Sequence, residues 1–482
     1  MHVRRPAISL EIVGKVHIRR QDEGGPRIRC DTGAWVRPQG HPYSGTNRLR
    51  AFRLLCVLTL AWFVPLFLNA QQSVARPRIG VALEGGGALG LAHIGVLEFL
   101  DANHIPVDYV AGTSMGGLVG GFYAMGKRPT EIQKLISEIN WDRVLRGQVP
   151  YRELAFRRKE DKRAYPNRLE LGLRHGLSVP GGLNSGQEVD FILDRETLPY
   201  YNLNSFDELP TPFRCIATDL STGTAHVFKD GSLSAALRST MSLPAIFSPF
   251  RNGAAVYADG GLLNNLPVDV VRAMGADIVI AVYLKNKPYD PKASQSLFGV
   301  LGRSVSVMIA ANERRNMEAA DILITVDLSK YTAIDYAAAP TIADQGYEGA
   351  KRKAPLLARL KVDEALWKQY LADRESKRIT SLPTPSFVKV TGITDSSSGR
   401  IERAFAEDLG KPINEQVIER RINRIAGLGR YSSLGYDLVD EDGKTGLLVR
   451  VEEKENSLPF STPASSWTAP TTTTLALVWA VG

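Results

Sequence analysis

The pattern of apolar and polar positions divides the chain into a long region of alternating strands and helices and a shorter C-terminal region. Between residues 78 and 285, apolar runs typical of buried strands are separated by stretches with helical spacing. The predicted strands are 79–83, 107–111, 213–218 and 278–283, and the predicted helices include 90–102, 115–125 and 129–140. This alternation predicts an α/β fold with a mostly parallel sheet.

A polar stretch follows this motif-bearing core, 78–285. Residues 286–375 have a helical pattern, apart from a strand-like run at 322–326. We therefore predict that the first domain spans residues 76–375. Residues 376–386 contain the Ser/Thr/Pro sequence typical of a linker.

The C-terminal region is predicted to be a separate α+β unit. Residues 387–454 read as strand, two amphipathic helices and two strands, with the last two strands paired around the Asp442-Gly443 turn. Residues 455–482 are rich in Ser, Thr, Pro and Ala, show no helical period and are predicted to be disordered.

The N-terminal stretch has the pattern of a targeting sequence. Residues 54–68 form an apolar run that follows three arginines and ends just before Ala70. A run of this length suits a secretory signal, whereas a spanning helix needs about 20 apolar residues. We therefore predict a signal peptide at 48–70 and export of the protein. Residues 1–47 are either a disordered basic leader or a mis-assigned start, with translation beginning nearer residue 45.

Charge narrows the classes of partner. The chain has a net charge of +8, and residues 1–70, with 11 Lys+Arg and 4 Asp+Glu, supply +7 of it. The remaining +1 leaves the body of the protein without an overall basic bias. We therefore expect no nucleic-acid partner.

The first chemical motif is a G-x-S-x-G sequence centred on Ser114. Gly112-Thr113-Ser114-Met115-Gly116 follows a predicted strand and precedes a predicted helix. In that context the motif forms a sharp turn that exposes the serine hydroxyl next to a helix N-terminus. The alternative is a turn with a helix-capping serine. We interpret Ser114 as a candidate nucleophile.

The second motif is a glycine loop after the first predicted strand. Gly85, Gly86, Gly87 and Gly90 lie in the sequence EGGGALG, where a loop that opens a helix presents free N–H donors to a negative charge. Such a loop can hold a dinucleotide pyrophosphate or form an oxyanion hole. Dinucleotide binding requires an acidic residue at the end of the second strand, but Ser114 follows that strand. The sequence therefore favours the oxyanion hole.

The third motif is Asp259-Gly260-Gly261. A serine nucleophile needs a base, but after Ser114 the chain has only His175 and His226, and no histidine follows Asp259. A catalytic triad in the common chain order Ser–Asp–His needs a histidine after the aspartate, and none follows Asp259. The economical alternative is a Ser–Asp dyad in which the carboxylate itself takes the proton.

Together these motifs resemble the patatin-like phospholipase family, because its three signatures occur in order between residues 78 and 285. The resemblance implies a three-layer α/β/α fold and hydrolysis of lipid acyl esters without a metal or other cofactor. Carried onto this chain, it makes Ser114 the nucleophile and Asp259 the base. The implied oxyanion donors are Gly85, Gly86 and Gly87, and the supporting glycines are Gly90, Gly112, Gly116, Gly260 and Gly261. Leu89 departs from the Arg or Lys of many members, which puts the head-group preference in doubt.

Residues 387–454 resemble a POTRA domain by their βααββ order and by the run 429–439. That resemblance implies a bacterial protein of the periplasm, outer membrane or cell surface. It also implies an outer-membrane barrel or assembly partner through 387–454, besides a membrane phospholipid or other lipid ester as substrate. Two functions stay open. One is a lipid acyl hydrolase of the phospholipase A type, and the other is an outer-membrane assembly or secretion component with an inactive patatin domain.

Overall fold

The computed structural model describes residues 76–147, 149–156, 159–160, 182–286, 307, 309–310, 313–393 and 395–454. These residues belong to one compact unit, Arg76–Gly482. The predicted leader at 1–47, the signal peptide at 48–70, and the tail at 455–482 lie outside the described residues, so these three interpretations stay predictions.

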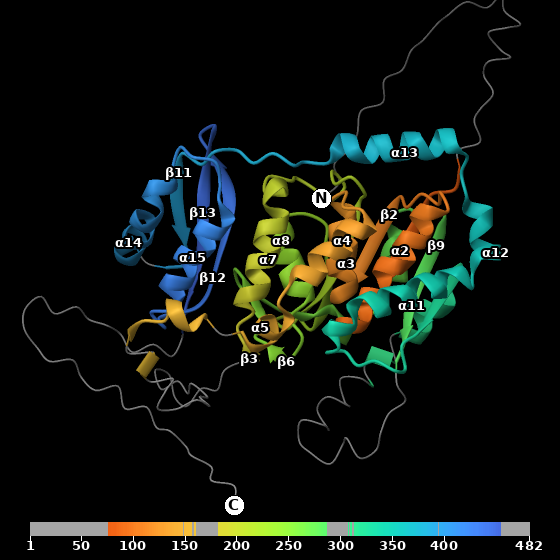
Figure 1. Cartoon of the computed structure of the whole chain (residues 1–482), viewed down its shortest axis with the longest axis horizontal. Helices are drawn as coiled ribbons and strands as arrows, with labels where there is room; N and C mark the ends of the chain where they lie inside the picture. The colour runs from red at the N-terminus through yellow and green to blue at the C-terminus, as the bar shows by residue number, and fades with distance from the viewer. Residues whose placement is uncertain are drawn as a thin grey trace, which may run out of the picture. The chain divides into compact units, whose positions relative to one another are not determined.

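The central feature is an eight-stranded sheet within the described residues, partly visible behind the helices in Figure 1. Its strands are β1 (Ile79–Leu83), β2 (Tyr109–Thr113), β4 (Phe213–Asp219), β5 (Thr224–Phe228), β7 (Phe250–Asn252), β8 (Ala255–Asp259), β9 (Ile278–Lys285) and β10 (Ile322–Asp327). The strand order is β10-β9-β1-β2-β4-β8-β7, with β5 also paired to β4. The five strands from β10 to β4 pair in parallel, whereas β5, β7 and β8 pair antiparallel. The predicted α/β fold with a mostly parallel core is confirmed.

Helices cover both faces of this sheet, because successive side chains of a strand point to opposite sides. In β1, Val81 and Leu83 pack into one apolar core, and Ala82 between them packs into another. The first core is covered by α2 (Ala92–Ala102), α3 (Met115–Ala124), α4 (Pro129–Glu138), α8 (Leu233–Thr240) and α11 (Ala339–Lys351). The second is covered by α9 (Val268–Ala273), which contacts β1, β2 and β9. The fold is thus the expected three-layer α/β/α arrangement.

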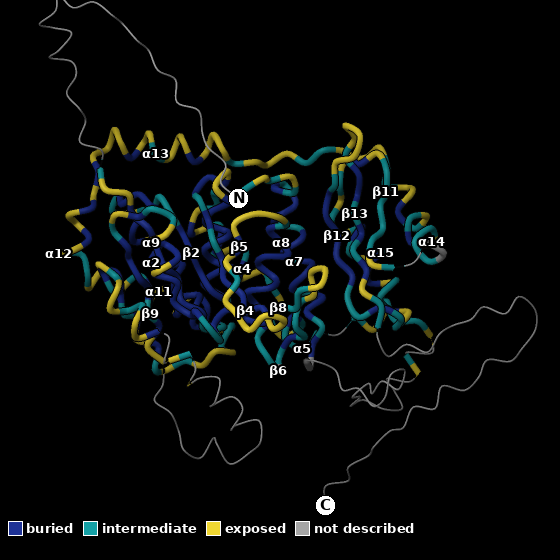
Figure 2. The backbone as a smooth tube through the Cα atoms, turned by 180° about the vertical axis from the view of Figure 1, so that it is seen from behind, coloured by how far each residue is buried: buried dark blue, intermediate teal, exposed yellow. Residues whose placement is uncertain are grey.

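The remaining elements of this region are smaller or peripheral. They are α5 (Trp141–Arg146), α7 (Gln187–Thr197), α12 (Ala354–Leu357), α13 (Glu364–Lys377) and the two-stranded pair β3 (Gly182–Asn184) and β6 (Ala245–Phe247). Most of α13 is exposed (Figure 2). Two side chains of α13 nevertheless pack against the rest of the domain. Trp367 stacks on His104, and the Arg374 guanidinium lies 4.0 Å from the centre of the Tyr123 ring.

Residues 387–454, here called the C-terminal module, have the predicted βααββ order. The elements are β11 (Phe387–Thr391), α14 (Asp395–Phe405), α15 (Glu415–Ala426), β12 (Tyr431–Glu441) and β13 (Lys444–Glu453), with sheet order β11-β13-β12. The apolar core of the module also contains Phe191 and Leu198, so the module packs against α7. Whether it is a POTRA domain stays a prediction.

The structure moves several predicted boundaries. β2 begins at Tyr109, not 107, because Asp108 turns its carboxylate to the Ile79 amide, 2.7 Å away, before the strand starts. The predicted helix at 90–102 opens with a 3-10 turn, Gly87–Leu91. The strand β8 was not predicted at all, although it carries Asp259, because it is a five-residue run set between glycines.

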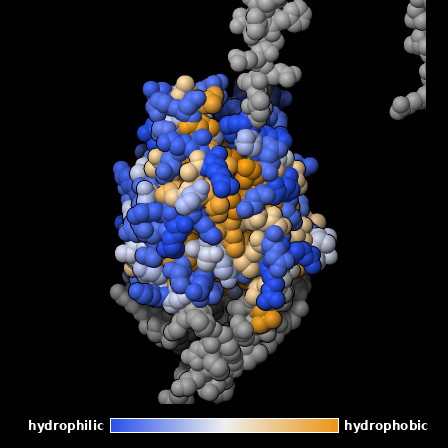
Figure 3. All heavy atoms as spheres, turned by 90° about the vertical axis from the view of Figure 1, so that its right-hand side faces the viewer, coloured by the Kyte–Doolittle hydropathy of each residue, from blue (hydrophilic) through white to orange (hydrophobic). Residues whose placement is uncertain are grey.

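Surface hydropathy is uneven. Figure 3 shows apolar side chains gathered among hydrophilic ones on the face turned to the right in Figure 1, the side on which α12 lies. That helix carries Leu356, which is exposed. Within the residues that the structure describes, no helix combines the length and apolarity needed to cross a bilayer.

Candidate active site

Ser114 occupies a strained turn between β2 and α3. Its backbone has φ 54° and ψ −124°, outside the conformations that L-residues ordinarily adopt. The turn is held because the Ser114 amide donates a 2.8 Å hydrogen bond to the Thr240 hydroxyl at the end of α8, and that hydroxyl donates to the Ile216 carbonyl. The side chain of Ser114 is only partly buried. These are the features expected of an exposed nucleophile on an elbow.

The two flanking glycines permit the backbone to approach closely at this turn. A Cβ atom at position 112 would lie 2.3 Å from the Gly116 carbonyl oxygen, and one at position 116 would lie 2.4 Å from the Leu83 carbonyl oxygen. Both distances are far below a normal contact. Gly112 and Gly116 therefore have the supporting role that the sequence predicts for them.

The edge of β4 brings Asp259 next to this elbow. Ile216 of β4 pairs with Thr113 on one side and Val227 on the other, and the next residue, Ala217, pairs with Asp259 and with His226. β5 pairs with one edge of β4 at both Ile216 and Ala217. The other edge of β4 therefore pairs with β2 at Ile216 and with β8 at Ala217, so β2 and β8 lie end to end along that edge. The last residue of β8 therefore meets the end of β2.

The carboxylate of Asp259 is buried, and one of its oxygens lacks a well-formed hydrogen bond. Oδ1 accepts a 2.8 Å bond from the Gly261 amide, whereas Oδ2 has no partner of good geometry among the described residues. Burial raises the pKa of Asp259 to about 6, and the neighbouring Ser114 hydroxyl and the Gly261 amide oppose that rise. Catalytic hydrogen bonds are often loose in a free enzyme. The pair is arranged for proton transfer from Ser114 to Asp259.

Gly260 is needed for the same approach. A Cβ atom at this position would lie 2.2 Å from the Ile216 carbonyl oxygen and 3.1 Å from the Thr113 methyl group. Any side chain would therefore push Asp259 away from the end of β2.

The amides of the glycine loop are not equivalent. The Gly85 amide donates to the Asn265 carbonyl at 3.2 Å, and the Ala88 amide donates to the Ala333 carbonyl at 2.8 Å. Within the described part of the chain, the amides of Gly86 and Gly87 have no acceptor. Of the three predicted donors, Gly85 is thus engaged elsewhere, and Gly86 and Gly87 are free to bind an oxyanion.

Two glycines of the loop also pack close to the elbow. A Cβ atom at Gly85 would lie 3.0 Å from the Ser114 Cβ, and one at Gly90 would lie 2.7 Å from the Met115 Cβ. The glycine loop and the elbow are therefore in direct contact, as the oxyanion interpretation requires.

The described histidines are engaged away from Ser114, and His104 stacks on Trp367 and faces Glu364. The His93 ring is buried with Nε2 2.7 Å from the Glu84 carbonyl oxygen, and burial lowers the pKa of His93 to about 4. His226 lies on the opposite side of β4 from Asp259. His175 lies outside the described residues. Within those residues, no group of three His, Cys, Asp or Glu side chains could hold a metal ion.

Comparison with known proteins gives the family. Residues 81–272, the stretch that contains both the elbow and Asp259, match the family model of the patatin-like phospholipases. The chain carries a patatin-like phospholipase domain. This match confirms the predicted family for the region of the three motifs.

Relatives of the patatin-like domain occur in bacteria and animals. An uncharacterized NTE family protein of Mycobacterium tuberculosis is 28% identical over 259 residues, which cover 52% of this chain and 63% of the relative. Patatin-like phospholipase domain-containing protein 6 of Homo sapiens is 31% identical over 220 residues, 45% of this chain and 14% of the relative. The chain thus spans less than two thirds of the length of these relatives.

Solved structures give a weaker likeness. VipD from Legionella pneumophila is 17% identical with a TM-score of 0.33, covering 59% of this chain and 67% of that chain. The type III effector ExoU is 14% identical with a TM-score of 0.29, covering 62% of this chain and 59% of that chain.

The structure adds residues to the site of the patatin-like domain that sequence reasoning missed. Asn265 contacts the glycine loop, and its position six residues after Asp259 was a usable signal. Tyr336 lies near enough to Asp259 for that carboxylate to help raise its pKa, and it stacks on Trp141 at 4.0 Å. Nothing in the sequence points to this aromatic pair.

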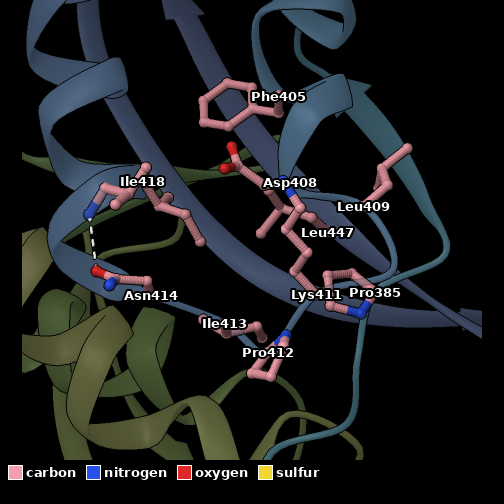
Figure 4. Close-up of a pocket in the computed structure, with 11 residues that line it drawn as sticks. Pro385, Phe405, Asp408, Leu409, Lys411, Pro412, Ile413, Asn414, Ile418 and Leu447 are labelled. Carbon is pink, nitrogen blue, oxygen red and sulfur yellow. Dashed lines mark hydrogen bonds between the residues drawn. The ribbon is translucent and has the colours of Figure 1, made fainter.

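The cavity drawn in Figure 4 lies apart from this chemistry, in the C-terminal module. Its volume is about 180 Å³. The lining is mainly apolar, with side chains from α14, α15 and β13 such as Phe405, Ile418 and Leu447 turned toward it (Figure 4). Serine, cysteine and histidine do not occur among its described lining residues.

Proposed function

We propose that this protein is a lipid acyl hydrolase of the phospholipase A type, with Ser114 as nucleophile and Asp259 as base. The observation that carries the proposal is the buried Asp259 carboxylate beside the Ser114 hydroxyl of a strained elbow, with an Oδ2 that has no well-formed partner among the described residues. The match to the patatin-like phospholipase family supports a lipid ester as substrate.

The geometry supports a two-step acyl transfer. Asp259 takes the Ser114 proton as the hydroxyl oxygen attacks the ester carbonyl, and the amides of Gly86 and Gly87 stabilise the oxyanion. Loss of one such donor costs about 3–4 kcal/mol in known enzymes. The alcohol leaves with the proton that Asp259 holds, and water then releases the fatty acid from Ser114 by the same route in reverse.

Replacing the nucleophile tests this proposal. With a fluorogenic long-chain ester as substrate, Ser114→Ala is expected to lower kcat by at least about 10³-fold. Ser137→Ala in α4 is the matched control, because that hydroxyl bonds only the Lys134 carbonyl at the surface, and it should leave kcat unchanged. If Ser114→Ala keeps activity within twofold of the wild type, the proposed mechanism is wrong.

The βααββ order of residues 387–454 favours one second function, an outer-membrane assembly or secretion component whose patatin domain is inactive. In that case Ser114→Ala would fully restore the phenotype of a strain that lacks the protein. The proposed hydrolase predicts no restoration. Export through a signal at 48–70 is part of the same proposal, and N-terminal sequencing of the mature protein from the bacterial envelope tests it.

A further inference from the structure

Asn265 clamps the first residue of the glycine loop from both sides. The main-chain carbonyl of Asn265 accepts a hydrogen bond from the Gly85 amide at 3.2 Å, and its side-chain Nδ2 donates to the Gly85 carbonyl at 3.3 Å. Its Oδ1 fills the space next to two backbone positions, since a Cβ atom at Gly85 would lie 2.5 Å from it and one at Gly261 would lie 2.8 Å from it. A single side chain thus joins the glycine loop to the turn that follows Asp259.

Two buried carboxyl groups hold this amide in turn. Asn265 Nδ2 lies 2.7 Å from Glu313 Oε1 and 3.3 Å from Glu84 Oε1. The other oxygen of Glu84 accepts a hydrogen bond from the Leu284 amide in β9, and the two carboxyl groups are hydrogen-bonded to each other. Glu84 and Glu313 are 3% and 8% exposed, so water does not satisfy them.

The two buried carboxyl groups are in contact, and the described residues place no cation beside Glu84. The titratable groups facing Glu84 are Glu313 and the Tyr283 phenol, whereas the nearby His93 ring bonds only its main-chain carbonyl. Burial, and then the charge of Glu313, raise the pKa of Glu84 well above its ordinary value. A raised pKa favours the protonated form of Glu84, whose hydroxyl can donate to Glu313.

We propose that Asn265, held by the side chains of Glu84 and Glu313, positions the glycine loop so that the Gly86 and Gly87 amides face the ester carbonyl at Ser114. This inference rests on the proposed hydrolase. A protonated Glu84 suits this role, because a negative charge directly before the loop would repel the oxyanion that the loop must stabilise. Asn265, Glu84 and Glu313 are positioning residues that do not touch the substrate.

The test compares the loss of the Asn265 side chain with the loss of the neighbouring Asn264 side chain. Asn265→Ala is expected to lower kcat at least tenfold with KM changed by less than threefold, because the loop binds the transition state and not the ground state. Asn264→Ala is the control. The Asn264 side chain bonds Asp269 and Asn316 and not the glycine loop, and its loss should change kcat by less than threefold.

The kcat values of two Glu84 variants give an independent test of the same network. Glu84→Ala should lower kcat about tenfold, whereas Glu84→Gln should stay within threefold of the wild type, since glutamine keeps a neutral donor toward Glu313 and an acceptor for the Leu284 amide. Each kcat is divided by the fraction of molecules that a lipid-like fluorophosphonate labels at completion, so misfolded protein does not count.

Three outcomes would overturn the inference: Asn265→Ala within twofold of the wild type, Asn264→Ala as poor as Asn265→Ala, or Glu84→Gln as poor as Glu84→Ala. Ser114→Ala, assayed in parallel, separates this inference from the proposed function. If Ser114→Ala is inactive and Asn265→Ala is fully active, only the positioning network fails. If Ser114→Ala is active, the hydrolase mechanism itself fails.

Discussion

Two buried aspartates, Asp259 in the patatin-like domain and Asp194 in α7, have similar surroundings and different partners. Asp194 lies where the C-terminal module packs on α7, and burial raises its pKa to about 7. It accepts hydrogen bonds from the Arg450 guanidinium at 2.6 Å, the Tyr436 amide at 2.8 Å and the Ser234 hydroxyl. Both of its oxygens accept hydrogen bonds, and the donors come from α8 and from the C-terminal module, so it holds two parts of the fold together.

The carboxylate of Asp259 is also buried, but its Oδ2 has no well-formed hydrogen bond among the described residues. Burial raises its pKa to about 6, as it raises that of Asp194 to about 7, so a raised pKa does not separate the two residues. What distinguishes Asp259 is the Oδ2 atom without a good partner, next to the Ser114 hydroxyl. The comparison teaches that two buried aspartates can differ in whether both oxygens are bonded, and the proposed role of Asp259 as base rests on this difference.

The largest expected effect comes from removing the charge of Asp259. Asp259→Asn keeps the shape and removes the base, so kcat should fall at least about 10³-fold. The matched change Asp194→Asn should leave kcat per labelled site within threefold. Steady-state kinetics on a long-chain ester checks both, and equal losses in the two variants would erase the distinction.

A smaller effect is expected from a methyl group placed behind Asp259. Gly260→Ala puts a Cβ atom 2.2 Å from the Ile216 carbonyl oxygen, so the turn must shift and kcat should fall about 10- to 100-fold. Gly399→Ala in α14 is the control, since a Cβ atom there meets nothing within 4 Å. An unchanged kcat in Gly260→Ala would mean that the approach of β8 to β2 is not needed.

Acid should inactivate the enzyme through Asp259. The base must be ionised to take the Ser114 proton, and its pKa is raised to about 6. We therefore expect kcat/KM to be constant at higher pH, half-maximal near pH 6 and about tenfold lower at pH 5. A pH–rate profile between pH 4 and 9 measures this, and a midpoint near pH 4 would show that the reactive carboxylate is not the buried one.

The smallest effect on activity is expected at the other aspartate. Arg450→Met removes the cation that faces Asp194, so the free energy of unfolding should fall by about 3 kcal/mol. The catalytic pair is left intact, and kcat per labelled site should stay within threefold. Urea unfolding and kinetics on the same sample test it, and a variant with full stability and lost activity would reverse the roles assigned here.

The parts of the site that could be predicted are those set by local sequence. The elbow at Ser114 follows from a strand, a helix and two glycines that are adjacent in the chain, and the glycine loop follows in the same way. Asp259 was reached by elimination of histidines, because the strand that carries it was not recognised. Its place next to Ser114 depends on the shared edge of β4, a long-range pairing that no local pattern encodes.

The partners that could not be predicted come from distant segments. Asn265 meets Glu84 and Glu313 across 181 and 48 residues of chain, and the sequence gives no sign that two acidic side chains are buried together. The same holds for the amides of the glycine loop. The Asn265 carbonyl accepts from the Gly85 amide and the Ala333 carbonyl accepts from the Ala88 amide, so these two amides are not available to a ligand. Hydrogen-bond competition of this kind appears only once the chain is folded.

Covalent labelling tests the central claim most directly. The full chain is treated with a lipid-like fluorophosphonate, and intact-mass and peptide mass spectrometry locate the adduct. The account predicts one adduct per molecule, on Ser114, formed at least about 100-fold more slowly in Asp259→Asn. An adduct on another residue, or labelling of Ser114→Ala at the wild-type rate, would contradict it.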